Sequence, residues 1–265
     1  MENSLWQHIR SVKEKAPLVH NITNYVVMNN TANALLAAGA SPIMSHAHSE
    51  IQDMVTICQS LVINIGTLDE YWVESMLKAA KKAKELKKPW VLDPVGAGAT
   101  PWRNQVLARL LELNPTVIRG NASEIQALAK ATDSMIKGVD SSLDSIKVME
   151  AAEKLHRDHH SVVCVSGQTD VVIGADRKVL LHNGHLLMTK VTGLGCSASA
   201  LISAFLGATE DPFEATVAAM ALFGVCGELA EKQSEGPGSF QVKILDQLYH
   251  ISEREFLTTI KMSYS

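Results

Sequence analysis

Short apolar runs alternate along the chain with longer segments in which apolar and polar residues recur at helical spacing. The short runs are rich in Val, Ile and Leu and predict buried strands at residues 40–44, 61–65, 90–92, 116–118 and 161–166. The longer segments predict helices at residues 4–15, 24–38, 50–58, 69–88 and 101–111, one that begins near Asn121 and one that ends near His159. Strands separated by helices imply right-handed crossovers and a largely parallel central sheet with helices on both faces.

The last part of the chain departs from this alternation. Residues 170–174 and 178–182 flank a polar turn and predict a β-hairpin, whereas the chain from Cys196 onward is almost wholly helical. There is no long linker and no repeat period, and the polar stretch 132–145 is too short to separate two domains. The sequence therefore predicts a single α/β domain that spans residues 1–265.

Charge and cysteine content narrow the class of protein. The 24 Lys and Arg residues against 28 Asp and Glu residues give a net charge of −4, which argues against nucleic acid or an anionic membrane as the main partner. The four cysteines lack metal-ligand spacing, which suits reduced thiols in the cytoplasm. The first residues lack the apolar core of a signal peptide, and no run of about 18 apolar residues predicts a membrane span.

A glycine-rich segment that we expect at a strand end, TGLGC at residues 192–196, has the composition of an anion site. Two glycines let the backbone approach a ligand closely, and the free amides of a following helix start attract negative charge. Cys196 would lie in the first helical turn, where the helix dipole favours a thiolate. The alternative is an ordinary turn into a buried helix, and the segment is neither a Walker loop nor a GxGxxG fingerprint.

Two further segments carry polar groups at predicted strand ends. In DPVGAG at 93–98, Asp93 is suited to a metal–phosphate complex, although Asp-Pro before glycine is also common in turns. In RGNASE at 119–124, Arg119 could bind phosphate oxygens through its forked guanidinium, and Ser166 ends the next strand. Glu124 has a second explanation, because it can close a capping box with Asn121.

These segments, together with VHNITN at 19–24, resemble the ribokinase-like superfamily and, within it, the hydroxyethylthiazole kinases. Each motif alone is weak, but four in this order over the whole chain are specific. The resemblance implies a ribokinase-like fold without a separate lid, and trimers whose active sites lie between subunits. Most of the superfamily has Asp where Cys196 stands, and cysteine at this position supports the narrower family.

The resemblance also implies an activity: transfer of the γ-phosphate of ATP to the primary alcohol of 4-methyl-5-(2-hydroxyethyl)thiazole, which salvages the thiazole half of thiamine. Carried onto this sequence, the family's site residues are Arg119 and Ser166 for ATP, Met44 and Gly193 for the thiazole, Cys196 as the base, and Asp93 and Glu124 for Mg²⁺. Two alternatives stay open: a related kinase for hydroxymethylpyrimidine or pyridoxal, and a regulatory protein that binds nucleotide without turning it over.

Overall fold

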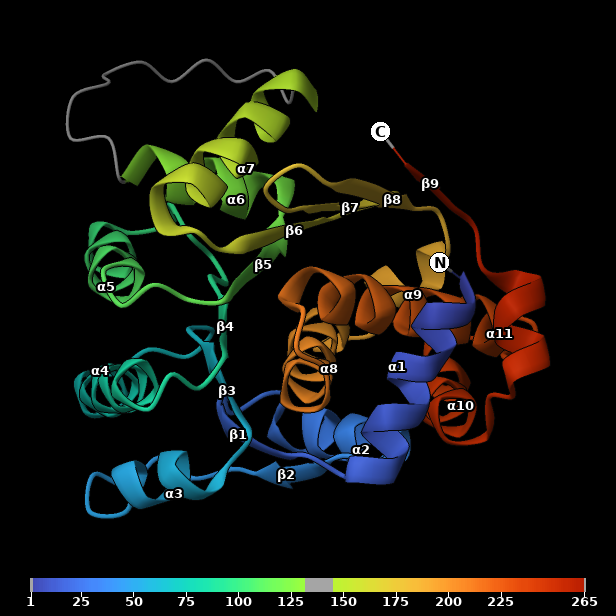
Figure 1. Cartoon of the computed structure of the whole chain (residues 1–265), viewed down its shortest axis with the longest axis horizontal. Helices are drawn as coiled ribbons and strands as arrows, with labels where there is room; N and C mark the ends of the chain where they lie inside the picture. Colours follow the sequence, from blue (N-terminus) through green and yellow to red (C-terminus); the bar gives the residue numbers. More distant parts are fainter. Residues whose placement is uncertain (1, 132–144, 265) are drawn as a thin grey trace.

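One nine-stranded sheet organises the molecule, with strand order β2-β1-β3-β4-β5-β6-β7-β8-β9 (Figure 1). The computed structural model describes residues 2–131 and 145–264. The six strands from β2 to β6 run parallel, and β7, β8 and β9 join them antiparallel at one edge. The strands are β1 (Leu18–Ile22), β2 (Ser41–Ile43), β3 (Ser60–Asn64), β4 (Trp90–Asp93), β5 (Val117–Asn121), β6 (Val162–Ser166), β7 (Asp170–Ile173), β8 (Lys178–Leu181) and β9 (Met262–Tyr264).

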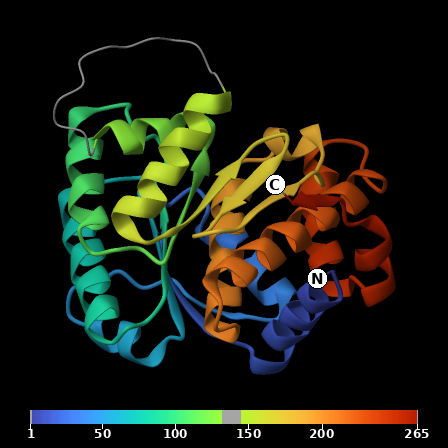
Figure 2. The ribbon, with the colours of Figure 1, turned by 45° about the horizontal axis from the view of Figure 1, so that its top comes forward.

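Helices cover both faces of this sheet, as predicted (Figures 1 and 2). One face is covered by α3 (Ile51–Ile57), α4 (Glu70–Glu85), α5 (Pro101–Leu111), α6 (Ala122–Ala131) and α7 (Ser145–His159). The other face holds the 3₁₀ helix η1 (Leu186–Lys190) together with α1 (Glu2–Lys15), α2 (Met28–Ala38), α8 (Leu194–Ala208), α9 (Pro212–Glu231), α10 (Pro237–His250) and α11 (Glu253–Thr259).

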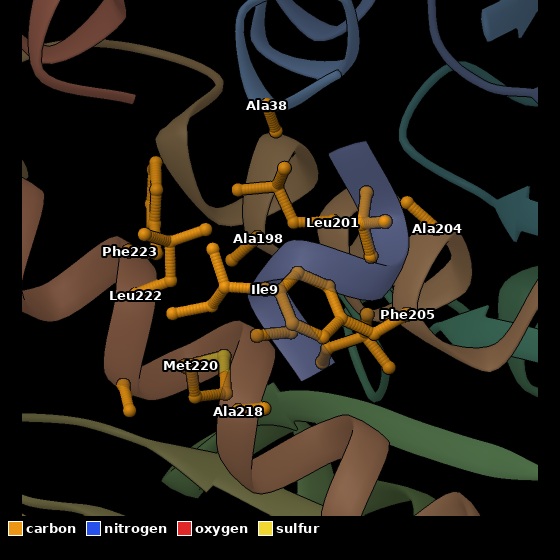
Figure 3. Close-up of a cluster of buried hydrophobic side chains, with 14 of the residues drawn as sticks. Ile9, Ala38, Ala198, Leu201, Ala204, Phe205, Ala218, Met220, Leu222 and Phe223 are labelled. Atoms are coloured by element: carbon orange, nitrogen blue, oxygen red, sulfur yellow. The ribbon is translucent and has the colours of Figure 1, made fainter. Parts of the chain in front are cut away.

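Each face of the sheet has its own hydrophobic core. Val62 and Val91 point into one core, while their strand neighbours Leu61 and Leu92 point into the other. This alternation explains why the central parallel strands are mainly apolar, since side chains on both faces of the sheet are buried. The core on the α8 side contains small residues of α8 and α9 against Ile9 and Phe205 (Figure 3).

Helix α9 is, by length and composition, apolar enough to cross a membrane, but 83% of its most apolar window is buried inside the protein. Its hydrophobicity is explained by its place in the core, where it packs against α8 and α10.

The structure confirms the α/β class and the hairpin, and it corrects three local predictions. Strands β1 and β9 fall in segments where no strand was predicted. The TGLGC segment follows η1 rather than a strand. It lies at the end of the sheet because it forms the start of α8, which packs across the strands. The polar stretch 132–145 lies almost wholly outside the described residues. A single domain over residues 1–265 stays a prediction.

Candidate active site

The carboxyl ends of the parallel strands bring the predicted polar residues together. Asn64 and Asp93 end neighbouring strands and are paired in register, as are Asn121 and Ser166. Helix α8 lies across β1, β3 and β4 and begins at this edge. This is the crevice in which open α/β sheets bind their ligands.

The two glycines of the TGLGC segment are required by close contacts. Gly193 has φ +83°, and a Cβ there would lie 2.6 Å from Cγ1 of Val27. A Cβ on Gly195 would lie 2.8 Å from Nη1 of Arg119. The guanidinium of Arg119 therefore lies directly against the first turn of α8, where positive charge and free amides together favour an anion.

Arg119 and Ser166 also line a cavity of about 750 Å³, which Gly195 and Leu186 border as well. The Nε atom of Arg119 is buried without a hydrogen-bond partner among the described residues. The hydroxyl of Ser166 donates to the carbonyl oxygen of Gly120 at 3.3 Å. The cavity thus lies beside the guanidinium of Arg119 and the start of α8.

Asp93 is buried at the centre of the site. Its Oδ2 accepts hydrogen bonds from Asn64 Nδ2 at 2.7 Å and from the hydroxyl of Ser199 at 2.8 Å. Its Oδ1 has no partner among the described residues. Burial raises the pKa of Asp93 to about 6, although the nearby charge of Arg119 opposes this shift.

Cys196 lies beside this carboxylate, partly buried in the first turn of α8. Its Sγ is 3.1 Å from Asn64 Nδ2 and 3.5 Å from Asn24 Nδ2. Burial, and after it the charge of Asp93, raises the pKa of the thiol to about 11. The thiolate is therefore not favoured in the free protein, because desolvation and a neighbouring carboxylate outweigh the two amide donors and the charge of Arg119.

Glu124 closes the capping box that the sequence predicted. Its Oε2 accepts from the amide of Asn121 at 2.9 Å, and Asn121 Oδ1 accepts from the amide of Glu124. Its Oε1 accepts from the amide of Gly96 at 3.1 Å, which ties α6 to the DPVGAG loop. Glu124 thus has a structural role, and its part in metal binding stays a prediction.

Three residues that the sequence did not single out complete the site, and the role of Met44 stays a prediction. Met44 follows β2 and is partly buried at the far side of β1. Asn64, Asn24 and Ser199 were given no role, yet all three bond to Asp93, to Cys196 or to one another. The available signal was a polar residue at the end of the apolar run LVIN, and a serine three positions after Cys196.

A model of the hydroxyethylthiazole kinase family matches residues 9–254. The chain belongs to this family. The hydroxyethylthiazole kinase of Leptospira biflexa is 53% identical over 247 residues, which cover 93% of this chain and 92% of that protein. The solved structure of the hydroxyethylthiazole kinase from Pyrococcus horikoshii OT3 is 42% identical, with a TM-score of 0.92 over 99% of both chains.

A more distant structure confirms the fold class. A ribokinase-like superfamily protein from Enterococcus faecalis is 12% identical, with a TM-score of 0.63 over 89% of this chain and 88% of that one. The predicted ribokinase-like fold is therefore correct, as is the predicted hydroxyethylthiazole kinase family.

Proposed function

We propose that this protein transfers the γ-phosphate of ATP to the primary alcohol of 4-methyl-5-(2-hydroxyethyl)thiazole, a salvage step for thiamine biosynthesis. The observation that carries the proposal is the contact of Gly195 with Arg119, beside Cys196 and Asp93. This arrangement places an anion site, formed by Arg119 and the start of α8, next to a proton acceptor, Cys196, at the carboxyl ends of the strands. Family membership and the identity to named hydroxyethylthiazole kinases support the thiazole alcohol over other acceptors.

The chain's residues supply positioning and charge, which are the main needs of phosphoryl transfer. ATP enters the cavity lined by Arg119 and Ser166. The amides at the start of α8 and the guanidinium of Arg119 stabilise the charge on the transferred group. The thiazole, a small and largely apolar ring, lies near Met44 and Gly193.

Cys196 accepts the proton of the alcohol in this mechanism. A pKa of about 11 leaves only a small fraction of Cys196 as thiolate at pH 7. This thiolate takes the proton of the alcohol late in the reaction and becomes the neutral thiol. A loose transition state tolerates this, because the attacking oxygen becomes acidic only as its bond to phosphorus forms.

Asp93 and Glu124 fit a magnesium ion that is shared with the phosphates of ATP. The unpartnered Oδ1 of Asp93 is a free oxygen ligand, and the charge of Glu124 acts on Asp93. Among the described residues, no group of three or more His, Cys, Asp or Glu forms a full protein cage. Mg²⁺ commonly uses one or two carboxylates, water and substrate phosphates. When bound, it would neutralise phosphate charge.

The proposal includes a homotrimer in the cytoplasm, with active sites between subunits. Tyr25 and Val26, next to Asn24, are 57% and 65% exposed, and Leu186 at the cavity is 74% exposed. A neighbouring subunit would cover such apolar residues and exclude water from the reaction. All four cysteines are free, which suits a reducing compartment.

An ADP-release assay with four reaction mixtures tests the activity. We expect turnover with the thiazole alcohol, and little with hydroxymethylpyrimidine, pyridoxal or no acceptor. Faster turnover of the pyrimidine or of pyridoxal would instead assign a related kinase activity to the protein. Nucleotide binding without ADP release in any mixture would identify a regulatory protein instead.

A further inference from the structure

One buried amide, that of Asn64, connects three elements of the site. Asn64 ends β3 and is paired in register with Asp93, which ends β4. Helix α8 crosses both strands, with Cys196 in its first turn and Ser199 one turn later. The amide of Asn64 contacts both Asp93 and Cys196. A shift of this side chain would therefore move two functional groups at once.

Every hydrogen-bonding position of Asn64 is occupied. Its Nδ2 lies 2.7 Å from Asp93 Oδ2 and 3.1 Å from Cys196 Sγ, which accounts for its two hydrogens. Its Oδ1 accepts from Asn24 Nδ2 at 2.9 Å and from the backbone amide of Gly66 at 3.0 Å. Exchanging the nitrogen and oxygen would turn an acceptor toward the carboxylate and a donor toward the Gly66 amide. The amide consequently has one orientation.

Asn24 is held in the same way. A Cβ on Gly66 would lie 2.7 Å from Asn24 Nδ2, so the glycine leaves room for this side chain. Asn24 Oδ1 accepts from the amide of Val26, and its Nδ2 reaches Cys196 Sγ at 3.5 Å. The sulfur of Cys196 therefore accepts from two amide groups, and its own hydrogen must point away from both.

The carboxylate of Asp93 is held by one of these amides, that of Asn64, and by the hydroxyl of Ser199. Asn64 and Ser199 both donate to Oδ2, which leaves Oδ1 without a partner among the described residues. Asn64 and Ser199 thus together leave Oδ1 of Asp93 free, and Asn64 also contributes to where the lone pairs of Cys196 point.

We propose that Asn64 is a positioning residue for phosphoryl transfer: it orients the sulfur of Cys196 and the free oxygen of Asp93 toward the reacting groups. This inference rests on the proposed function, in which Cys196 accepts the proton of the alcohol and Asp93 serves the metal. Asn64 itself acts only through these two side chains. A small misplacement of a reacting group costs as much as about 10²-fold in rate.

The first test separates turnover from binding. Asn64→Leu keeps the shape of the side chain but removes both N–H donors, whereas Asn64→Ser keeps a single donor. We expect kcat to fall about 10- to 100-fold in Asn64→Leu and less in Asn64→Ser, with KM for ATP within about threefold of wild type. If Asn64→Leu does not fold, Asn64→Ser alone carries the comparison. An unchanged kcat in the folded variant overturns the proposal.

The second test measures the reactivity of the Cys196 thiol independently of phosphoryl transfer. Cys58, Cys164 and Cys226 are buried and Cys196 is not, so iodoacetamide labels Cys196 selectively, with Cys196→Ser as the blank. Loss of an N–H donor to sulfur should slow labelling of an Asn64 variant about tenfold at pH 8. Ser199→Ala, which removes the other donor to Asp93 Oδ2, should label at the wild-type rate. Equal labelling of all three proteins overturns the positioning of Cys196.

The two proposals fail in different ways. Wild-type kcat in Cys196→Ala would overturn the catalytic role of the thiol but would leave the labelling difference of Asn64→Leu intact. Wild-type labelling in Asn64→Leu together with a low kcat in Cys196→Ala would overturn only the positioning role.

Discussion

The thiol of Cys196 occupies the position of the proton acceptor, and its surroundings set how much it contributes to the reaction rate. The pKa of Cys196 is raised to about 11 by burial and by Asp93, so only a small fraction is ionised near neutral pH. General-base help is typically worth about 10²–10⁴-fold, and a late proton transfer favours the lower end. Cys196 is therefore a base whose active, ionised form is present only in a small fraction of the molecules.

We expect Cys196→Ala to lower kcat about 10²-fold and to leave ATP binding nearly unchanged, because the amides of α8 and Arg119 remain. Cys196→Asp should retain activity, since a carboxylate also accepts a proton. Steady-state kinetics with the thiazole alcohol, and ATP titration without it, measure both effects. A wild-type kcat in the alanine variant would remove Cys196 from the mechanism.

Asp93 gives a stability effect with a definite pH dependence. Its folded pKa of about 6 lies above the ordinary value of 3.8 for an aspartic acid, so folding favours the protonated form. The stabilisation from this carboxyl is complete below pH 3.8 and is lost as the pH rises through about 6. Asp93→Asn, which stays neutral, should therefore raise Tm relative to wild type more at pH 8 than at pH 4.5.

Thermal melts at both pH values test this expectation, with Asp176→Asn as a control that removes an exposed carboxylate. The control should change Tm equally at the two pH values. The same Asp93→Asn protein should lose about 10²-fold or more of its Mg²⁺-dependent turnover. A variant that is destabilised at pH 8 and not at pH 4.5 would contradict the proposed cost of burying this charge.

At the scale of elements, helices α6 and α8 begin at the site. The first turn of each contains residues that stabilise the helix and that we also assign to the reaction. Glu124 binds two backbone amides with two different oxygens. Glutamine has only one acceptor oxygen, so Glu124→Gln keeps one of these bonds. The substitution therefore removes a charge and also weakens the start of α6.

We expect Glu124→Gln to cost about 1 kcal/mol of stability and to raise the Mg²⁺ concentration for half-maximal turnover about tenfold. Asn121→Ala is the matched control, because it removes the reciprocal cap at a similar cost and keeps the carboxylate. Its Mg²⁺ requirement should match wild type. If both variants show the same Mg²⁺ requirement, Glu124 acts only as a cap.

The start of α8 depends on Gly193 for its shape. A Cβ there meets Val27 at 2.6 Å in a left-handed conformation, so Gly193→Ala must displace the 23–27 loop or the helix start. We expect a Tm several degrees lower and a higher KM for the alcohol. Gly238→Ala in α10 is the control, since nothing lies within 4 Å of its Cβ. Equal behaviour of the two variants would contradict the assigned packing.

At the scale of the whole molecule, the site lies at one edge of a sheet that is buried on both faces. Three large apolar side chains, those of Tyr25, Val26 and Leu186, are exposed in the single chain. A second copy of this chain is the partner that the proposed trimer supplies. Covering Leu186 would also help to enclose the cavity at Arg119, which it borders.

Light scattering should give about three times 28.7 kDa, and activity should fall on dilution if the trimer separates. Val26→Asp places a charge on this exposed apolar surface and should lower both the molar mass measured by light scattering and kcat. An active monomer, or a charged variant that stays trimeric and fully active, would contradict sites between subunits.

The sequence by itself determined the features that depend on neighbouring residues. Apolar runs between helices predicted most of the parallel strands, because the side-chain period and strand length are local properties. The helix at 101–111 coincides with α5, since proline and a threonine cap mark its start. The capping box of Asn121 and Glu124 was predicted for the same reason, as it needs only four consecutive residues.

The tertiary structure decided what depends on distant residues. Strand β1 was missed because His20 and Asn21 interrupt its apolar pattern, and their cost is reduced by bonds to the Ser45 and Val19 carbonyl oxygens. The pKa of Cys196 rises rather than falls, because desolvation depends on everything packed around it. The contacts of Asn64 form only where β3, β4 and α8 pack together. The register between β3 and β4 that this requires is not encoded by any local sequence pattern.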